Sequence, residues 1–337
     1  MTSRLYIVFL FCFFIYGCSD FSTPQEDDIK LFKHEISWGA LPLNDNIDIS
    51  SIYKPGDLLF DAVLAIQRNH WSKAIKELTP YAEKKDPDAL FWLAQISYGS
   101  NPTENIKAGK MMLESAQLGN PYAALMFNPD NIICKRYFSH YCDKKWVSKA
   151  KDIFSKQVEK SDVRAIYYTE KFKEKHDDYI NAVIYAANNN YYYPIVNYSK
   201  DILIDNNSTK KMKELAIELL NYAADNNFVP AYDLLFKYDE VLDSKEYNLL
   251  LKQSIKLGSN VAWNRRATSS VTDKSLSNVD KYIIAKATYD FNRDKFALSF
   301  IKKLDESIIN HANEEAQEIV DSIPKIIYID GTHPTID

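Results

Sequence analysis

One helical pattern recurs six times between residues 57 and 270, and it limits the chain to a fold built from stacked helix pairs. Each copy has an apolar residue at a reference position, another four residues earlier, and Ala or Tyr eight residues earlier, so that all three lie on one helical stripe. The reference positions are Ala82, Ala116, Val158, Ala187, Ala224 and Ile255. Their spacings of 34, 42, 29, 37 and 31 residues are typical of helical repeats.

The residues that follow each reference position predict a tight turn into a second helix. Three residues later stand Gly119, Asn190, Asn227 and Gly258, the residue types that tolerate the left-handed conformation at a helix end. The other two copies have Lys85 and Ser161 there, and we expect those helices to end differently. The next position supplies helix N-caps in four copies: Asp86, Asn120, Asp162 and Ser259. The second helix then starts with a small residue in every copy: Ala89, Ala123, Ala165, Pro194, Ala231 and Ala262.

This helix–turn–helix unit resembles the Sel-one-like repeats, a subfamily of the tetratricopeptide-type helical hairpins. The segments 107–123 and 86–99 carry the resemblance most clearly. It implies an all-α fold, an αα-hairpin repeat solenoid in which about six to seven helix pairs form a right-handed superhelix. A concave surface suited to protein or peptide partners is expected of such a solenoid.

The flanks of the repeats divide the chain into five expected parts. Residues 1–17 are a lipoprotein signal peptide, 18–56 a lipidated tether with an irregular lead-in, and 57–279 the repeats. Residues 280–324 are a degenerate repeat with capping helices, and 325–337 are a C-terminal tail. The tail begins with a short β-prone run, 325–329, to which the sequence assigns no role.

The N-terminus has the features of a bacterial lipoprotein signal. Arg4 precedes an apolar run, Leu5 to Tyr16, that is too short to span a membrane and fits a secretory signal. The run ends at Cys18 in a sequence that resembles a lipobox, which implies a lipid on the thiol and, with Ser19 next, an outer-membrane anchor with the body in the periplasm. The alternative is an ordinary signal peptide with an incidental cysteine.

Cys134 and Cys142 are the two cysteines of the expected mature body, and an oxidising compartment favours a disulfide between them. On one straight helix their Cα atoms would be ~12 Å apart, whereas a disulfide needs them within ~7 Å. The bridge therefore predicts a turn between them, in the longest interval of the repeat. Two buried thiols, or a zinc site that includes His140, are the alternatives.

The composition and motifs disfavour catalysis and nucleic-acid binding. The chain has 8 Gly in 337 residues and a net charge of −5, without glycine-rich nucleotide loops or a basic tract. None of the 6 His stands at a metal-ligand spacing. We therefore expect no enzyme activity, no cofactor, no metal and no nucleic-acid partner.

Aromatic residues are the more suggestive feature, with 23 Tyr, 17 Phe and 5 Trp. Tyr, Trp and Arg dominate interface hot spots, so the candidate partner-binding residues are Tyr191, Tyr192, Tyr193, Trp263, Arg265 and Arg266. Consecutive residues of one helix cannot all face inward, which predicts that one of the three tyrosines is exposed. Burial between stacked helices, or biased codon usage, are the alternative reasons for so many rings.

These features together predict a non-catalytic, membrane-tethered periplasmic solenoid that binds a protein partner. An acidic Sel-one-like lipoprotein is similar to immunity proteins that neutralise phospholipase effectors of type VI secretion, which implies a toxin as the partner. A general envelope scaffold without a dedicated partner is the alternative, and an enzyme of unrecognised type is the third possibility.

Overall fold

The computed structural model describes residues 20–36, 43–238 and 244–334, and this part of the chain forms helices and no strands. The predicted signal peptide and Cys18 lie outside it. The first half contains α1 (Asp28–Glu35), α2 (Phe60–Gln67), α3 (Trp71–Glu83), α4 (Pro87–Ser97), α5 (Pro102–Leu118), α6 (Pro121–Met126), α7 (Ile132–Tyr137), α8 (Lys144–Val158) and α9 (Val163–Lys171). The second half contains α10 (His176–Asn188), α11 (Tyr193–Ile204), α12 (Lys210–Asp225), α13 (Val229–Tyr238), α14 (Ser244–Lys256), α15 (Asn260–Thr272), α16 (Asn278–Asn292) and α17 (Glu306–Asp321).

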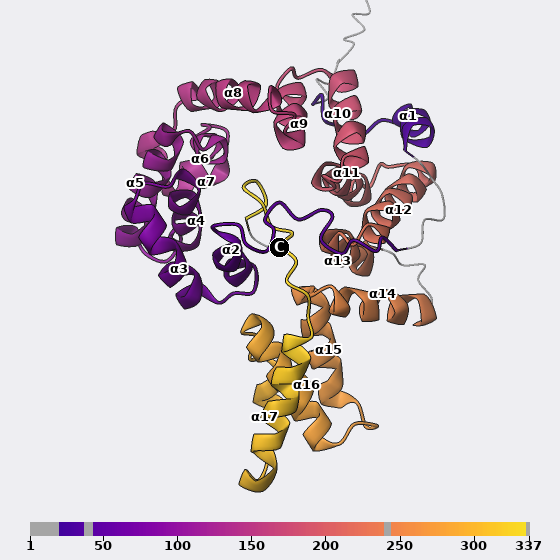
Figure 1. The fold of residues 1–337 in the computed structure, drawn as a ribbon. Helices are drawn as coiled ribbons and strands as arrows, with labels where there is room; N and C mark the ends of the chain where they lie inside the picture. The colour runs from indigo at the N-terminus through magenta and orange to yellow at the C-terminus, as the bar shows by residue number, and fades with distance from the viewer. Residues whose placement is uncertain (1–19, 37–42, 239–243, 335–337) are drawn as a thin grey trace, which may run out of the picture.

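The six predicted repeats are six helix pairs, which confirms the αα-hairpin repeat fold. The pairs are α3–α4, α5–α6, α8–α9, α10–α11, α12–α13 and α14–α15. From α2 onward each helix packs on the next along the chain, except that α6 packs on α8 past the short α7, and α2 to α14 follow one another around a ring (Figure 1). Helix α1 packs on α10 instead. Within the described residues, no helix is long and apolar enough to cross a membrane.

The turns between paired helices use the predicted chemistry, and they use it more uniformly than predicted. The side chains of Asp86, Asn120, Asp162 and Ser259 all accept backbone hydrogen bonds as N-caps. The expectation that Lys85 and Ser161 end their helices differently is wrong, because both have positive φ, 63° and 58°, like Asn190 and Asn227 at 66° and 60°. Packing of the two helices dictates the turn, and it outweighs the cost of about 1–2 kcal/mol that a left-handed residue with a Cβ carries.

The small residues at the start of each second helix are fully buried. The five alanines, Ala89, Ala123, Ala165, Ala231 and Ala262, have no exposed surface. A residue without a long side chain lets the backbones of neighbouring helices approach closely. The repeat pattern therefore encodes the distance between helices as well as their periodicity.

The last helices form a module that projects from the ring (Figure 1). Helices α15, α16 and α17 pack on one another around a second apolar core that contains Trp263, Ile283 and Phe291. Residues 280–324, for which the sequence predicts a degenerate repeat with capping helices, contain most of α16, a short 3-10 helix, Ala297–Phe300, and α17.

The disulfide between Cys134 and Cys142 is present, as predicted. Their Cα atoms are 6.0 Å apart, because α7 ends at Tyr137 and a 3-10 turn, Ser139–Tyr141, brings the chain back. Both thiols are consumed by the bond, so they supply no zinc ligands beside His140. No three His, Cys, Asp or Glu side chains of the described residues are placed to hold a metal.

Candidate functional site

The inside of the ring, where an open solenoid would hold a partner, is occupied by the chain's own C-terminal tail (Figure 1). Ile326, Ile327, Tyr328 and Ile329 are at most 3% exposed and belong to the main core. The Gln67 amide on α2 pairs with them as a neighbouring strand would: its Nε2 donates to the Ile326 carbonyl at 2.9 Å, and its Oε1 accepts from the Tyr328 amide at 2.8 Å. The β-prone run thus lies extended against helices.

The last described residues of the tail also pack tightly against the helices of the ring. The Gly331 Cα faces the ring of Tyr122 so closely that a Cβ added there would lie 2.3 Å from Cδ2. The His333 ring stacks on Tyr193 with centroids 3.6 Å apart. Burial would raise the pKa of Asp330, but the His333 ring, the Arg164 charge and backbone amides lower it far below its usual range.

The segment that precedes α2 also lies inside the ring (Figure 1). The Asn44 amide donates to the Asp225 carbonyl at 2.9 Å, and the Asn227 side chain donates to the Asn44 carbonyl at 2.6 Å. Further along, the Tyr53 hydroxyl accepts from the Trp92 indole at 2.9 Å. The concave surface predicted for a partner is therefore covered by the chain's own two ends.

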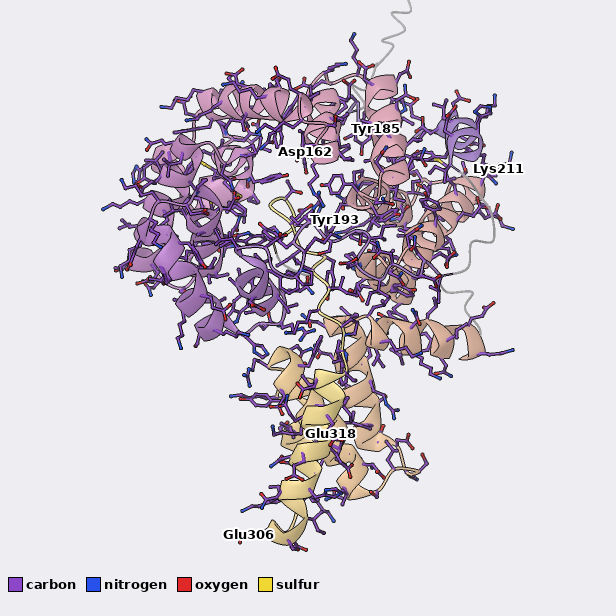
Figure 2. All side chains as sticks on the ribbon, in the orientation of Figure 1. Asp162, Tyr185, Tyr193, Lys211, Glu306 and Glu318 are labelled. Carbon is purple, nitrogen blue, oxygen red and sulfur yellow. A yellow bond between two sulfur atoms is a disulfide. The ribbon has the colours of Figure 1, made fainter. Side chains whose placement is uncertain are left out.

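The prediction that a tyrosine of the 191–193 run is exposed is wrong. Tyr191, Tyr192 and Tyr193 are 3%, 1% and 7% exposed. The three tyrosines are not consecutive residues of one helix, because α11 begins only at Tyr193 and the first two precede it. The C-terminal tail covers Tyr193, which lies inside the ring of helices (Figure 2). The space shared by Tyr191, Tyr193, Ile329 and Asp330 leaves no room for a water molecule.

Trp263 is also buried, at 5% exposure, which contradicts its role as a partner contact. Its indole donates to the Ile255 carbonyl at 3.1 Å and its ring lies 5.3 Å from that of Phe291. Arg265 is exposed but already contacts the Tyr247 hydroxyl at 3.3 Å, and Arg266 is half-buried. Of the six candidates, the two arginines are the ones whose side chains still reach the surface.

A groove between the ring and the projecting module exposes aromatic and cationic side chains, whereas the tyrosines and Trp263 predicted to bind a partner are buried. It is lined on one side by His70 and by Trp71 and Lys73 in the first turn of α3, and on the other by Tyr289 in α16 and by Arg293 and Lys295, which follow α16. The Trp71 ring is 43% exposed, and the Arg293 guanidinium lies 5.3 Å from the centre of the Tyr289 ring.

Two further exposed rings follow the groove residues along the chain. Phe296 and Phe300, directly after Lys295, are 52% and 60% exposed, and their centroids are 5.0 Å apart. No motif predicts this surface, because its two halves are more than 200 residues apart in sequence. We call it the junction groove and define it by Trp71, Lys73, Tyr289, Arg293 and Lys295.

Residues 20–36, within the segment 18–56 predicted as a lipidated tether and irregular lead-in, are docked on the ring. Asp28, at the start of α1, is 3% exposed. Its carboxylate accepts from His176 Nε2 and from the Tyr198 hydroxyl, each at 2.8 Å. The other His176 nitrogen, Nδ1, lies 2.8 Å from the Phe21 carbonyl, and the Phe21 ring packs edge-on against Tyr179.

This His176–Asp28 clasp favours a charged imidazole. Both ring nitrogens face acceptors, and only the imidazolium form can donate to both. Burial alone would lower the pKa of His176, but the hydrogen bonds to Asp28 and Phe21 outweigh it and raise the pKa. His176 therefore fixes the start of the described chain to α10.

No protein-family model matches the sequence, and no curated protein does. Among solved structures, the chain is similar to a protective antigen present in uropathogenic Escherichia coli strains, which displays an SLR fold. The two are 13% identical with a TM-score of 0.39, over 80% of this chain and 62% of that one. This chain therefore spans less than two thirds of that protein's length.

Proposed function

We propose that the protein is a non-catalytic scaffold that binds another protein through the junction groove. The observation that carries the proposal is that exposed Trp71 lines one groove with Arg293 and Lys295, and exposed Phe296 and Phe300 follow directly in the chain, since Trp and Arg dominate interface hot spots. Among the described residues neither cation has an ion-pair partner. The filled ring leaves such an outer surface as the place where a folded partner can bind.

The proposed anchor is a lipid on Cys18, on the grounds of the lipobox-like sequence. Two or more acyl chains are needed for lasting attachment, which is what a bacterial lipoprotein carries. The proposed location is the outer membrane, with the helical body in the periplasm. A Cys18→Ser variant is expected to move from the membrane fraction to the soluble periplasm, and unchanged fractionation would contradict the anchor.

For the partner, we propose a secreted phospholipase effector that the protein neutralises as an immunity protein. The support is the resemblance to Sel-one-like immunity lipoproteins, together with an anchor that would hold the inhibitor where such an enzyme acts and raise its effective concentration there. A general envelope scaffold is the second candidate. Deletion of the gene followed by challenge with wild-type siblings separates the two, since equal survival without a neighbouring lipase gene supports the scaffold.

The groove itself is tested by affinity capture from the native cell. A Trp71→Ser/Lys295→Glu variant removes one ring and reverses one charge, and it should weaken a stoichiometric partner by at least about 30-fold if these are hot-spot residues. The control is an Ile132→Ser/Lys210→Glu variant, which removes an exposed apolar side chain and reverses one lysine charge outside the groove. Ile132 is 74% exposed. Equal capture by both variants would contradict the groove as the binding surface.

A further inference from the structure

The clasp on α10 limits where the proposed lipid can be. Phe21 is held by His176 and Tyr179, and Cys18 precedes it by three residues. Three residues span at most about 11 Å even when fully extended. Whatever path the chain takes, a lipid on Cys18 therefore lies close to the start of α10, so the edge of the ring around this point must face the bilayer.

The helices that lead up to this edge carry an excess of positive charge, whereas acidic side chains stand where the described chain meets α10: Asp20, Glu26, Asp27, Asp28, Asp177 and Asp178. Residues 135–175, from α7 to the turn before α10, contain twelve Lys or Arg against six Asp or Glu, a net charge of +6. The whole chain has −5, so the other residues together carry −11. Figure 1 shows α8 running along the rim of the ring toward α10, beside which the described chain begins.

Several of these lysines are available for a partner. Lys156, Lys160 and Lys175 are exposed, and none has an ion-pair partner among the described residues. Lys145 and Lys149 also lie against the Trp146 ring, at 5.6 and 5.7 Å, but both are engaged within the chain, Lys145 with the Asp143 carboxylate and Lys149 with the Gln117 carbonyl. The three exposed lysines have long apolar stems that let their ammonium groups extend toward a charged, planar partner.

We propose that this lysine edge, defined by Lys156, Lys160 and Lys175 together with α8, rests on anionic phospholipid headgroups. The inference rests on the proposed lipid anchor, which would hold this edge near the headgroups, whose potential decays over a Debye length of about 8–10 Å. Polybasic segments that close to an anionic leaflet gain binding free energy for each Lys or Arg. The edge would thus orient the body on the membrane as a second attachment beside the acyl chains.

A protein partner with an acidic surface is the competing occupant of a basic edge. The lipid surface is favoured by position, because the clasp holds the chain within reach of its anchor at this edge. The junction groove, in contrast, lies at the base of the projecting module, on the other side of the ring (Figure 1).

The test uses the unlipidated chain from residue 19, which retains every described residue, with vesicles that contain phosphatidylglycerol or phosphatidylcholine alone. We expect cosedimentation with the anionic vesicles at low salt and its loss at high salt. A Lys156→Gln/Lys160→Gln/Lys175→Gln variant should bind about 10- to 100-fold more weakly. A Lys210→Gln/Lys211→Gln/Lys213→Gln variant at the start of α12 loses the same charge on another edge and should bind like the wild type (Figure 2).

Equal binding to both kinds of vesicle, or an equal loss in both triple variants, would overturn the lysine edge. So would a chain that ignores anionic vesicles yet is captured by an acidic protein. These outcomes are separate from failure of the anchor, because Cys18→Ser fractionation in cells tests the lipid without involving the lysines. An anchored protein whose edge ignores anionic vesicles refutes this inference and leaves the proposed function standing.

Discussion

The substitution Ile327→Ala tests whether the C-terminal tail is part of the hydrophobic core. Ile327 has no exposed surface and lies between the helices of the ring. The substitution removes three carbons, which is about 2.4 kcal/mol of transfer free energy at about 0.8 kcal/mol each. The cavity left behind adds to this, because the surrounding helices are held by their own repeats, so we expect the free energy of unfolding to fall by about 3–4 kcal/mol.

Urea unfolding followed by circular dichroism measures this loss, with Ile319→Ala as the matched control. Ile319 lies on α17 with 37% of its surface exposed, and the same change there should alter stability by less than about 0.5 kcal/mol. If Ile327→Ala costs no more than the control, the tail is loosely seated, and a concave surface open to partners has to be reconsidered.

Three further predictions concern the turns, the disulfide and the clasp. Ser161→Gly should raise the unfolding free energy by about 0.5–1 kcal/mol, since it relieves a left-handed Cβ at a small entropic cost; thermal unfolding is the measurement. Reduction of the Cys134–Cys142 bond should lower it by about 2.5 kcal/mol, the loop-closure value for eight residues, and no change under reductant would contradict that. The raised pKa of His176 means that the charged ring stabilises the fold fully below about pH 6.5, and that this contribution is lost as pH rises through the raised pKa. The stability difference between wild type and His176→Asn should therefore shrink toward alkaline pH, and a difference independent of pH would refute the clasp.

Local sequence signals were sufficient to predict the helix pairs. A helical stripe, a left-handed turn residue and an N-cap all act within a few residues of one another, so Ala116, Gly119 and Asn120 already specify one hairpin. The failure at Ser161 shows the limit of this reasoning. Propensity at a single turn position is worth about 1 kcal/mol, and the packing of two helices overrides it.

The filling of the ring could not be predicted, because it depends on contacts between distant parts of the chain. Gln67 meets Ile326 across 259 residues, and Asn44 meets Asn227 across 183. A run such as 325–329 shows β-propensity but not which surface will cover it. A contact between residues distant in sequence also explains why the exposure of a tyrosine was wrongly predicted. The burial of Tyr193 is set by His333 and not by the neighbours of Tyr193 in sequence.

The junction groove and the clasp are also formed by residues far apart in sequence. Their positions together define how the protein would be oriented on a membrane. The clasp places the proposed anchor beside α10, whereas the module of α15 to α17 projects from the opposite side of the ring (Figure 1). The tail joins these regions into one body, because it hydrogen-bonds to Gln67 near the groove and to Asn197 on α11. A body attached at the clasp would therefore hold the groove away from the lipid, where a soluble partner arrives first. Binding there would intercept a membrane-active partner before it reaches the bilayer.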